Sequence, residues 1–429
     1  MPHIVILGGG LGGTLMAFEM KEKMRAEDRL TLVSLGTSYS FVPSNPWVAV
    51  GWRQPADITV DLAPVLKQHG IALRPEGAER VEPGESRIRL GDGSFLEYDY
   101  LVVATGPELA FDEVPGLGPD AHTQSICQTE HAMRAKAAFD RLVKAPGPVV
   151  IGAAPGASCF GPAYEFAFIL DTALRKARIR DQVPMTFVTP EPYIGHLGLD
   201  GVGDTKGLLE SAMRERHIKW ITNARTTRID PDRLSVEEVD DSGAVKAAHK
   251  LPFAFSMLLP AFRGVAAVRV EGLTNPRGFV TIDKHQRSPA FPNVFAVGVC
   301  VAIPPVGKTP LAVGVPKTGF MIESMVTATA QNIASLLKGE EPQAVATWNA
   351  VCLADFGDDG IAFVAQPQIP PRNVNWSARG LWVHAAKIGF EKYFLHKIRQ
   401  GRADTFYENL ALDLLGIQKL KQIHIEPTA

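Results

Sequence analysis

Long apolar runs, a secretion signal and a strong net charge are all missing from this 429-residue chain. No stretch approaches the roughly 18 uninterrupted apolar residues of a transmembrane helix, so none is predicted. The N-terminal segment MPHIVILGGG lacks the charged region and cleavage site of a signal peptide, and we expect the mature chain to begin near Met1. A formal net charge of −2 gives no general attraction to nucleic acid.

Cysteine is also scarce. The chain has four cysteines that lie far apart in sequence, namely Cys127, Cys159, Cys300 and Cys352. They are too few for a disulfide scaffold, and no pair has the Cys-x-x-Cys spacing of a zinc site, so we expect no metal. On the residues alone, the ordinary interpretation of any one of them is a buried thiol.

The residues that are abundant favour an α/β enzyme. Short apolar or β-branched runs bounded by Gly, Pro or Asp alternate with longer helical segments, which predicts parallel sheets covered by helices. The expected strands are residues 3–7, 30–34, 98–104, 148–152, 184–188, 256–260 and 293–297. The expected helices are residues 11–26, 129–143, 161–177, 204–216 and 316–337.

Two segments, starting at His3 and Pro148, repeat the order strand, glycine-rich turn, helix. This repeat predicts two tandem Rossmann-like domains of the glutathione-reductase type. We expect an FAD-binding unit formed by two parts of the chain, a second Rossmann-like unit between them, and a C-terminal unit. In the order of the chain, these segments are residues 1–110, 111–284, 285–340 and 341–429.

The first turn has the pattern of a dinucleotide site. ILGGGLGG places Gly8, Gly10 and Gly13 in Gly-x-Gly-x-x-Gly spacing directly after a strand and at the start of a helix. Glycine permits a tight turn and close approach of a pyrophosphate, and the helix N-terminus supplies N–H donors. The acidic residue that usually binds the ribose is missing, and Ser34 stands in its place.

Two short motifs resemble those with which flavoproteins of the glutathione-reductase type close over FAD. One strand ends on Ala104–Gly106 and another on Gly298. The second motif usually continues with Asp, where this chain has Val299. Pro316 suits a first helical position, so we expect the following helix to point its positive N-terminal end at the flavin.

The second turn, in PVVIGAAPGASCFG, lacks the features that bind a dinucleotide. Ala154 and Ala157 replace glycines, and Pro155 removes a backbone donor. We expect no Asp, Glu or Arg after the next strand, VPMTFVTPEP, at the place where a ribose or its phosphate would be recognised. We therefore expect that NAD(P)H is not bound. The segment SYSFVPSNPWVAVGW also lacks the Cys-x4-Cys of lipoamide-type and glutathione-type enzymes.

Seven segments together resemble sulfide:quinone oxidoreductases over nearly the whole chain. They are VPSNPWV, SICQTEHA, GASCFGPAYEF, LLPAFRG, AIPPV, PKTGFMIE and CLADFGDDG. The resemblance implies that Cys159 and Cys352 form a redox-active pair beside FAD, whose disulfide hydrosulfide attacks. Cys159 stands at a helix entrance, which acidifies a thiol. In some members the equivalent of Cys127 attaches the flavin through a thioether, and in others it helps to admit sulfide or to handle product. Both roles stay open.

The same resemblance implies roles for further residues. His131, Glu165 and His196 line the sulfide side. The residues implied for the quinone site are Leu353, Lys387, Phe390 and Tyr407. The residues implied for FAD are Gly8, Gly10, Leu11, Gly12, Gly13, Ser34, Pro43, Ser44, Ala78, Ala104, Thr105, Gly106, Gly298, Lys317, Thr318 and Gly319.

The segment 378–420 is expected to form two amphipathic helices. One apolar stripe contains Trp382, Ala386, Gly389, Phe390 and Tyr393, and the other contains Phe406, Leu410, Leu414 and Ile417. Lys397 and Asp413 interrupt these stripes. Residues 372–402 carry seven basic residues and one acidic residue, a local net charge of +6. This predicts docking on the surface of the prokaryotic inner membrane, next to a lipid-soluble quinone. Helices that cap the sheets, or that pair a homo-oligomer, are the alternative.

Three other functions stay open. A type II NADH dehydrogenase shares this architecture and FAD, but it needs an intact second turn. The flavin subunit of a flavocytochrome c sulfide dehydrogenase has similar cysteines, but it needs a secretion signal. A flavin-bound redox sensor would use the cysteines without turnover. Rapid bleaching of the flavin by sulfide, and not by NADH, would separate these functions.

Overall fold

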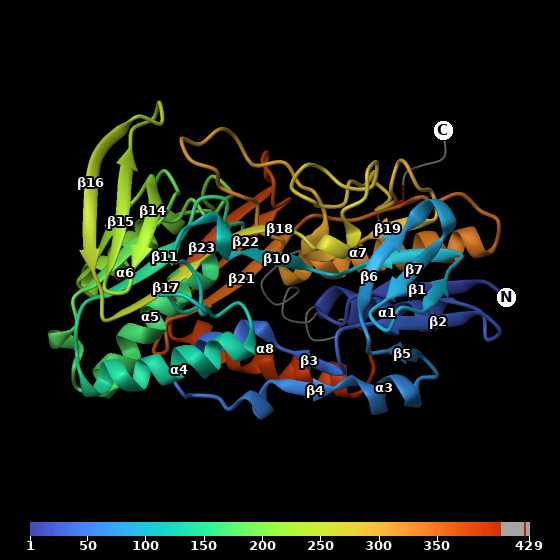
Figure 1. Cartoon of the computed structure of the whole chain (residues 1–429), viewed down its shortest axis with the longest axis horizontal. Helices are drawn as coiled ribbons and strands as arrows, with labels where there is room; N and C mark the ends of the chain where they lie inside the picture. Colours follow the sequence, from blue (N-terminus) through green and yellow to red (C-terminus); the bar gives the residue numbers. More distant parts are fainter. Residues whose placement is uncertain (405–423, 426–429) are drawn as a thin grey trace.

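A five-stranded parallel sheet forms the first unit. The computed structural model describes residues 1–404 and 424–425. The strand order is β19-β9-β1-β2-β5. The strands are β1 (His3–Leu7), β2 (Arg29–Val33), β5 (Ala72–Arg74), β9 (Tyr100–Val103) and β19 (Val294–Ala296). Helices α1 (Leu11–Lys23) and α7 (Gly319–Leu337) pack against each other beside this sheet (Figure 1). Every residue of β1 is buried, as expected for a parallel strand covered on both faces.

A four-stranded parallel sheet forms the second unit, in the order β13-β12-β11-β17. Its strands are β11 (Val149–Ala153), β12 (Met185–Val188), β13 (Ile218–Ile221) and β17 (Phe255–Leu259). The helices of this unit are α4 (Thr129–Lys144), α5 (Gly161–Lys176) and α6 (Thr205–Glu215). The predicted α/β class is confirmed. All seven predicted strands are present, and each of their ends lies within two residues of the predicted position. The domain boundaries proposed above stay a prediction.

Smaller antiparallel elements surround the parallel sheets. The sheet β14-β15-β16 projects from the second unit (Figure 1). The strands of these elements are β3 (Ser38–Ser40), β4 (Thr59–Asp61), β6 (Ala78–Glu82), β7 (Arg87–Leu90), β8 (Phe95–Glu97), β10 (Pro107–Ala110), β14 (Ala224–Asp230), β15 (Arg233–Val239), β16 (Val245–Pro252) and β18 (Ala261–Gly264). The short helices α2 (Asn45–Ala49) and α3 (Leu62–Gln68) complete the first unit.

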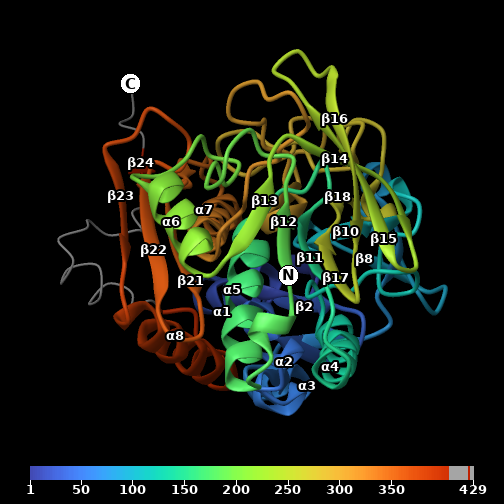
Figure 2. The same cartoon turned by 90° about the vertical axis from the view of Figure 1, so that its left-hand side faces the viewer.

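The C-terminal unit contains a sheet that the sequence analysis did not predict. Strands β21 (Ala350–Asp355), β22 (Gly360–Gln366) and β23 (Val374–Arg379) pair antiparallel, and helix α8 (Trp382–Arg399) follows them (Figure 2). A short pair joins β20 (Ala344–Val345) to β24 (His424–Ile425). Strand β21 contacts α5, α7 and α8. One apolar core runs from the first unit through the second into α8. This sheet therefore joins the two Rossmann-like units.

Helix α7 begins later than predicted. Its first residue is Gly319, and Thr318 is its N-cap, with a side-chain oxygen that accepts a hydrogen bond from the Met321 N–H at 3.4 Å. Pro316 and Lys317 therefore lie in the preceding loop. The reason is that a threonine N-cap satisfies a free helix N–H, which a proline two residues earlier does not do.

Helix α8 is present, but its buried face is not the predicted stripe. Gly389 is exposed, and Phe390 and Tyr393 are half-buried. The buried face consists of Val383, Lys387, Glu391, Phe394, Leu395, Lys397 and Ile398. The charged members of this face form ion pairs within the protein, which explains why charges interrupt the apolar stripe. The second predicted helix, with Phe406 to Ile417, lies outside the described residues.

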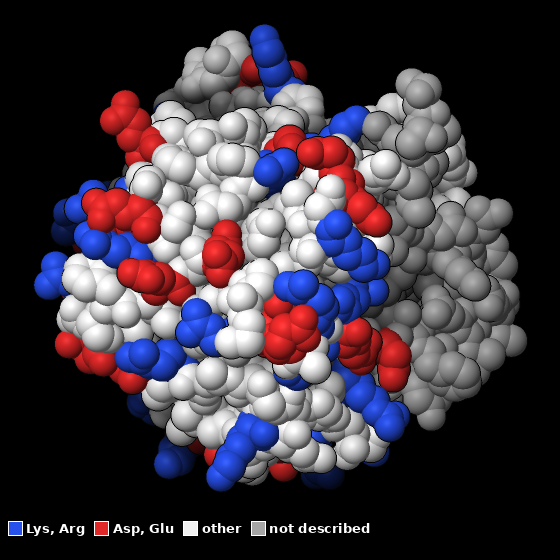
Figure 3. Space-filling view, turned by 90° about the vertical axis from the view of Figure 1, so that its right-hand side faces the viewer, with Lys and Arg blue, Asp and Glu red and all other residues white. Residues whose placement is uncertain are grey.

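The local excess of positive charge is smaller at the surface than in the sequence. Of the seven basic residues between 372 and 402, the structure engages four within the protein, namely Arg372, Arg379, Lys387 and Lys397. Lys392, Arg399 and Arg402 are exposed. On the face of the molecule drawn in Figure 3, acidic and basic side chains are interspersed. Within residues 1–404 and 424–425, no helix is both long enough and apolar enough to cross a membrane.

Candidate active site

The first glycine-rich turn has room for a ligand at one position and tight packing at two others. Gly8 has φ +124°, and an added Cβ would lie 2.3 Å from the Ala104 carbonyl oxygen. At Gly13 the added atom would lie 1.8 Å from the Gly8 oxygen. At Gly10, the N-cap of α1, no described heavy atom lies within 4 Å of an added Cβ. This open space at a helix N-terminus, without an acidic residue in the first turn, fits a pyrophosphate.

Four of the residues implied for FAD lie close together at the first turn, namely Leu11, Gly12, Gly298 and Gly319. An added Cβ on Gly319 would lie 3.8 Å from Leu11 Cδ2, so the N-terminal ends of α1 and α7 are neighbours. An added Cβ at Gly12 would lie 3.3 Å from Ile322 of α7. Gly298 has φ +83°, which a glycine adopts most easily, and donates its N–H to Met325 Sδ at 3.4 Å. Two positive helix ends therefore face this region, as an anionic cofactor requires.

The other residues implied for FAD lie nearby or have different partners. The buried Ser34 lies against Gly9, where an added Cβ would be 2.3 Å from its hydroxyl oxygen. The Thr105 hydroxyl donates to the Gly106 carbonyl at 3.2 Å. The Ser44 hydroxyl donates to Glu391 of α8 at 2.5 Å, which leaves its oxygen able to accept a further hydrogen bond. Pro43 is exposed, and Ala78 is half-buried at the start of β6.

Lys317 links the first turn region to the cysteines. Its side chain is half-buried, and burial lowers the pKa of its ammonium group to about 8, an effect that the neighbouring Cys300 and Cys159 oppose. The Cys300 thiol is fully buried and donates to the carbonyls of Val297 and Val103 at 3.2 and 3.3 Å. The position of Cys300 fits the ordinary interpretation of a buried thiol.

The second turn is covered by the protein itself. Gly152 still allows the backbone to pack closely, since an added Cβ would lie 1.8 Å from the Val188 carbonyl oxygen. The Ala154 N–H donates to the Leu259 carbonyl at 2.8 Å, and the Gly156 N–H donates to the Ala312 carbonyl at 2.7 Å. Ala154 and Ala157 are both 1% exposed. The N–H groups of Ala154 and Gly156 are thus already paired, and the Gly314 N–H donates to the Ala157 carbonyl, so the segment 311–316 lies over the turn.

One observation about the second turn corrects the sequence analysis. Glu191 lies three residues after β12, at a position where an acidic residue can recognise a ribose. Its carboxylate is fully buried and accepts hydrogen bonds from the Tyr164 hydroxyl at 2.7 Å, the Thr189 hydroxyl at 2.6 Å and the Leu197 N–H at 2.6 Å. Burial raises the pKa of Glu191 to about 7. It therefore holds the loop after β12 and does not face a nucleotide.

Three of the four cysteines converge. Cys127, Cys159 and Cys352 are half-buried free thiols. Cys127 raises the pKa of Cys159, and Cys159 raises the pKa of Cys352, so each of these two pairs lies within electrostatic range. Lys387 Nζ lies 2.9 Å from Glu165 of α5 and 3.4 Å from the Leu353 carbonyl oxygen next to Cys352, so β21 passes close to the start of α5. Cys159 comes two residues before α5, and Cys352 lies within β21. The fold therefore brings together a pair that lies far apart in the sequence.

The helix entrance does not acidify Cys159 in this structure, which corrects the sequence-based expectation. Burial raises the pKa of the Cys159 thiol to about 12, and Cys127 and Glu165 raise it further. Lys317 and the Gly161 N–H act in the opposite direction but with smaller effect. Burial likewise raises the pKa of Cys352, and Lys387 opposes it. Desolvation therefore outweighs the helix end and the lysines.

Glu165 and Lys387, for which the sequence implied separate sites, form one buried ion pair. Lys387 Nζ lies 2.9 Å from Glu165 Oε1, and both side chains are less than a tenth exposed. Lys387 also donates to the Leu353 carbonyl at 3.4 Å. Burial raises the pKa of Glu165 to about 7, while Lys387 lowers it. The pair adjoins Cys352, because both partners influence its titration.

The two histidines have different surroundings. His131, on α4, has Nδ1 3.3 Å from the Ser125 hydroxyl oxygen, and this oxygen also accepts the Cys127 N–H at 3.2 Å. His131 therefore belongs to the Cys127 side. His196 is buried in the loop after β12, where its Nδ1 accepts the Gly198 N–H at 3.2 Å. Burial lowers the pKa of both rings. Among the described contacts, His196 has none with the cysteines.

Aromatic rings surround the residue implied for the quinone ring. Phe390 lies 4.7 Å from Phe394, 5.8 Å from Phe41 and 6.4 Å from Phe320, measured between ring centroids. These rings come from α7, α8 and the segment before α2. Phe320 is stacked on Phe390, whereas Phe41 and Phe394 are tilted against it, so together they form an aromatic and apolar environment around Phe390. Leu353 is half-buried on β21. Tyr407 lies outside the described residues.

The sequence analysis missed a group that holds β21 in place. Asp355, at the end of β21, is fully buried, and it accepts the Trp47 indole N–H at 2.7 Å. His384 Nδ1 lies 2.7 Å from the same carboxylate. Arg53 similarly pairs with the buried Glu391 at 2.9 Å. The available signal was an acidic residue at the end of an apolar strand, which a buried partner has to compensate.

Comparison with known proteins identifies the family. The model of the pyridine nucleotide-disulphide oxidoreductases matches residues 2–331. A sulfide-quinone reductase of Aquifex aeolicus is 41% identical over 415 residues, which are 96% of this chain and 94% of the relative. The chain belongs to the sulfide-quinone reductases of this family. These reductases are FAD-dependent α/β oxidoreductases, and the open first turn fits that cofactor.

Two solved structures extend the comparison. The crystal structure of the Aquifex aeolicus sulfide:quinone oxidoreductase matches with a TM-score of 0.92 over 99% of this chain and 96% of that chain. The NDH2 of Plasmodium falciparum, solved in complex with NADH, is 14% identical and matches with a TM-score of 0.70 over 98% of this chain. The second likeness concerns the fold alone. A sulfide:quinone oxidoreductase and a protein solved in complex with NADH thus share this fold.

Proposed function

We propose that this protein oxidises sulfide through Cys159 and Cys352 and passes the electrons through FAD to a quinone. The observation that carries the proposal is the convergence of the two half-buried thiols next to a nucleotide turn that the chain itself covers. The Aquifex aeolicus relative, at 41% identity, is a sulfide-quinone reductase. A covered second turn argues against NADH as the electron donor.

The atoms and charges of the cysteine chemistry balance, with FAD as the acceptor of two electrons. Hydrosulfide attacks the Cys159–Cys352 disulfide, and one sulfur–sulfur bond forms as another breaks, which leaves a persulfide on one cysteine and a thiolate on the other. Joining the thiolate to the outer persulfide sulfur releases one proton and two electrons and gives a bridge one sulfur longer. FAD, when bound, supplies the two-electron acceptor and passes the electrons to the quinone. Repetition lengthens the sulfur chain until it is released.

Charged neighbours compensate for the burial of the thiols. Because burial raises the pKa of both cysteines, a thiolate forms there only with a cation at hand. We assign Lys317 to Cys159 and Lys387 to Cys352, since each lowers the pKa of that thiol. Glu165, with a pKa raised to about 7 by burial, is placed to take up the released proton.

For the sulfide side we propose Cys127 and His131, which share the Ser125 hydroxyl as a partner. Whether Cys127 also carries the flavin through a thioether is decided by the mass of the denatured protein. A mass increased by one FAD means a covalent link, and the mass of the bare chain means a bound but unlinked cofactor. Release of all flavin on acid precipitation would agree with the second result.

We further propose that the start of α8 docks on an anionic membrane surface. Leu381 is 76% exposed and Trp382 is 43% exposed, and Phe390 of the quinone site lies on the same helix. Replacing both exposed residues by aspartate is expected to weaken sedimentation with phosphatidylglycerol vesicles about tenfold, because apolar area is lost and negative charge is added. Val245→Asp, at an exposed valine of β16, is the matched control. Equal sedimentation of all three proteins would contradict the docking site.

Anaerobic stopped-flow mixing tests the reaction. Sulfide is expected to bleach the flavin absorbance of the holoenzyme within milliseconds to seconds, and added quinone is expected to restore it. NADH is expected to leave the absorbance unchanged. Bleaching by NADH and not by sulfide would replace this proposal by a type II NADH dehydrogenase. Bleaching by neither would leave a redox sensor without turnover.

A further inference from the structure

Strand β21 and helix α5 run side by side, and their contacts advance together along both segments. Near the start of α5, Lys387 Nζ lies 2.9 Å from Glu165 of α5 and 3.4 Å from the carbonyl oxygen of Leu353, the neighbour of Cys352 in β21. Further along, the Phe356 ring lies 3.9 Å from the Phe168 ring, measured between centroids. The alignment of this strand along the helix therefore decides which residue of β21 faces Cys159.

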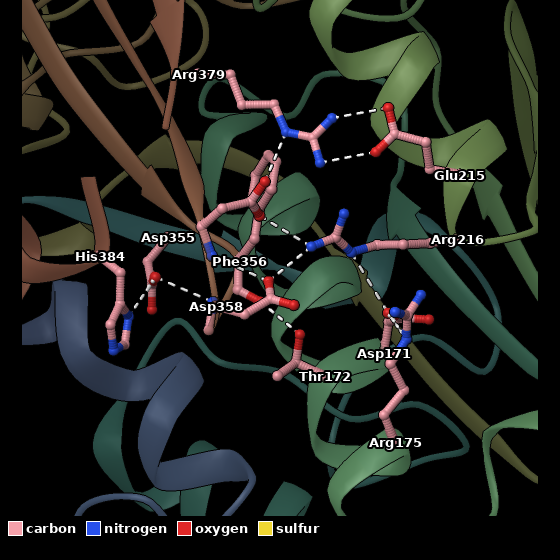
Figure 4. Close-up of polar contacts among 12 residues, drawn as sticks. Asp171, Thr172, Arg175, Glu215, Arg216, Asp355, Phe356, Asp358, Arg379 and His384 are labelled. Atoms are coloured by element: carbon pink, nitrogen blue, oxygen red, sulfur yellow. Dashed lines mark hydrogen bonds and ion pairs between the residues drawn. The ribbon is translucent and has the colours of Figure 1, made fainter. Parts of the chain in front are cut away.

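The far end of this alignment is fixed by hydrogen bonds at the turn between β21 and β22. The Thr172 hydroxyl of α5 donates to the Phe356 carbonyl at 2.7 Å (Figure 4). An added Cβ on Gly357 would lie 2.6 Å from the Trp52 ring, so the turn is also packed closely. At the cysteine end no covalent bond is present, since both thiols are free. The turn is thus held both by a hydrogen bond and by close packing.

One arginine connects this turn to α5. Arg216, the C-cap of α6, is 5% exposed. Its Nη2 lies 2.7 Å from Asp358 and 2.9 Å from Asp359, both in the turn. Its Nε lies 3.4 Å from Asp171 of α5 (Figure 4). The guanidinium group also lies 5.5 Å from the centroids of both Phe168 and Phe356.

The fork geometry of Arg216 matters for this connection. A guanidinium group presents several donors in one rigid plane, so it can bind carboxylates on two sides at fixed angles. A lysine at the same place keeps the charge but has a single point of attachment. Asp171 keeps two other partners, Arg175 at 2.9 Å and Arg180 at 2.5 Å, so it stays compensated when Arg216 changes.

We propose that Arg216 is a positioning residue for the cysteine pair. By binding the β21–β22 turn to Asp171 of α5, it sets the alignment at which Cys352 meets Cys159. A disulfide forms only within a narrow range of Cα separations and directions, so a small slip of the strand lowers the tendency of the pair to close. The inference rests on the proposed function in one respect, the use of Cys159 and Cys352 as a pair.

The test measures closure of the pair directly, without sulfide or quinone. The holoenzyme is equilibrated with mixtures of reduced and oxidised glutathione, which takes two electrons and two protons from the thiols and becomes two reduced molecules. Mass spectrometry of the alkylated Cys159 and Cys352 peptides then gives the closed fraction. For Arg216→Lys we expect the closure constant to fall at least about tenfold, or about 30 mV for a two-electron couple. We expect the closure constant of the double variant Asp358→Asn, Asp359→Asn to fall to a similar extent.

Two controls separate positioning from general loss of stability. Arg175→Gln removes a partner of Asp171 without touching the turn, and Arg214→Gln changes an exposed arginine of the same helix as Arg216. In both variants we expect the Cys159–Cys352 pair to close to the same extent as in the wild type and FAD to stay bound. Wild-type closure in Arg216→Lys, or in the turn double variant if only that variant folds, would overturn the proposal. Failure of sulfide to bleach the flavin would instead overturn the proposed function and leave this measurement unaffected.

Discussion

The two glycine-rich turns of this chain begin alike and then differ, most clearly at their third residue. Gly8 and Gly152 each let a strand end lie against a neighbouring backbone, and an added Cβ would overlap with a carbonyl oxygen at both. Two residues further, Gly10 faces open space, whereas Ala154 is buried and its N–H is bonded to Leu259. The packing glycine is needed by the fold, and the second glycine is needed only by a ligand.

This difference shows how one architecture can serve two electron donors. The first turn keeps free N–H donors at a helix end, which an anionic cofactor can use. The second turn pairs its donors with the segment 311–316 and carries Cys159 just beyond. In the proposed function, the thiol next to the covered turn supplies a covalent sulfur chemistry in place of a bound nicotinamide.

Removing either thiol should have the largest effect. For Cys159→Ala and Cys352→Ala we expect sulfide-dependent bleaching of the flavin to slow by at least about a thousandfold, because the covalent step is lost. FAD should stay bound, since the first turn is unchanged. Stopped-flow absorbance measures the rate. Cys300→Ala, at a fully buried cysteine of the first unit, is the control and should react within about twofold of the wild type. A wild-type rate in either cysteine variant would disprove the mechanism.

A charge at the first turn should remove the cofactor. Gly10→Asp places a carboxylate in the open space at the N-terminus of α1. Two unit charges about 4 Å apart repel by about 4 kcal/mol at an effective dielectric constant of about 20. We therefore expect the Kd for FAD to rise at least about a hundredfold, measured by flavin fluorescence. Gly84→Asp adds the same charge at another open glycine and should bind FAD normally. Equal affinities would show that the cofactor lies elsewhere.

The sequence was sufficient for the parallel sheets and, through its resemblance to one family, for the prediction that two distant cysteines act as a pair. Buried apolar runs such as β1 indicate strands without further context, and the cysteine segments resemble one family closely. The sheet β21–β23 was missed because most residues of β21 and β23 are only half-buried, so neither strand shows a clear alternation of buried and exposed positions. The ion pairs of Lys387 and Glu391 were missed for another reason. A charge in an apolar stripe shows that a partner exists, but only the fold shows which residue it is.

Glu191, which holds the loop beside the second turn, should make stability depend on pH. Burial raises its pKa from 4.5 to about 7. Because the folded chain keeps this proton longer than the unfolded chain does, stability falls as the pH rises from 4.5 to 7, by roughly 3 kcal/mol in total. In Glu191→Gln this part of the decline should disappear, and the free energies of unfolding of the two proteins should converge toward pH 4. Urea unfolding of each holoenzyme at several pH values measures its free energy of unfolding. A constant difference across pH 4–8 would contradict this, and Glu210→Gln is the surface control.

The smallest effect should follow from restoring glycine to the second turn. In Ala154→Gly, Ala157→Gly, the two Cβ atoms are removed, yet the backbone donors remain paired with Leu259 and with the segment 311–316. Glu191 also still faces the protein interior. We therefore expect no NADH-dependent bleaching above the wild-type background and no NADH binding by calorimetry. If the variant bound NADH, the Cβ atoms alone would have kept the nucleotide out. Side-chain volume alone would then explain why the second turn does not bind NADH, and the pairing of its backbone N–H groups would have no effect.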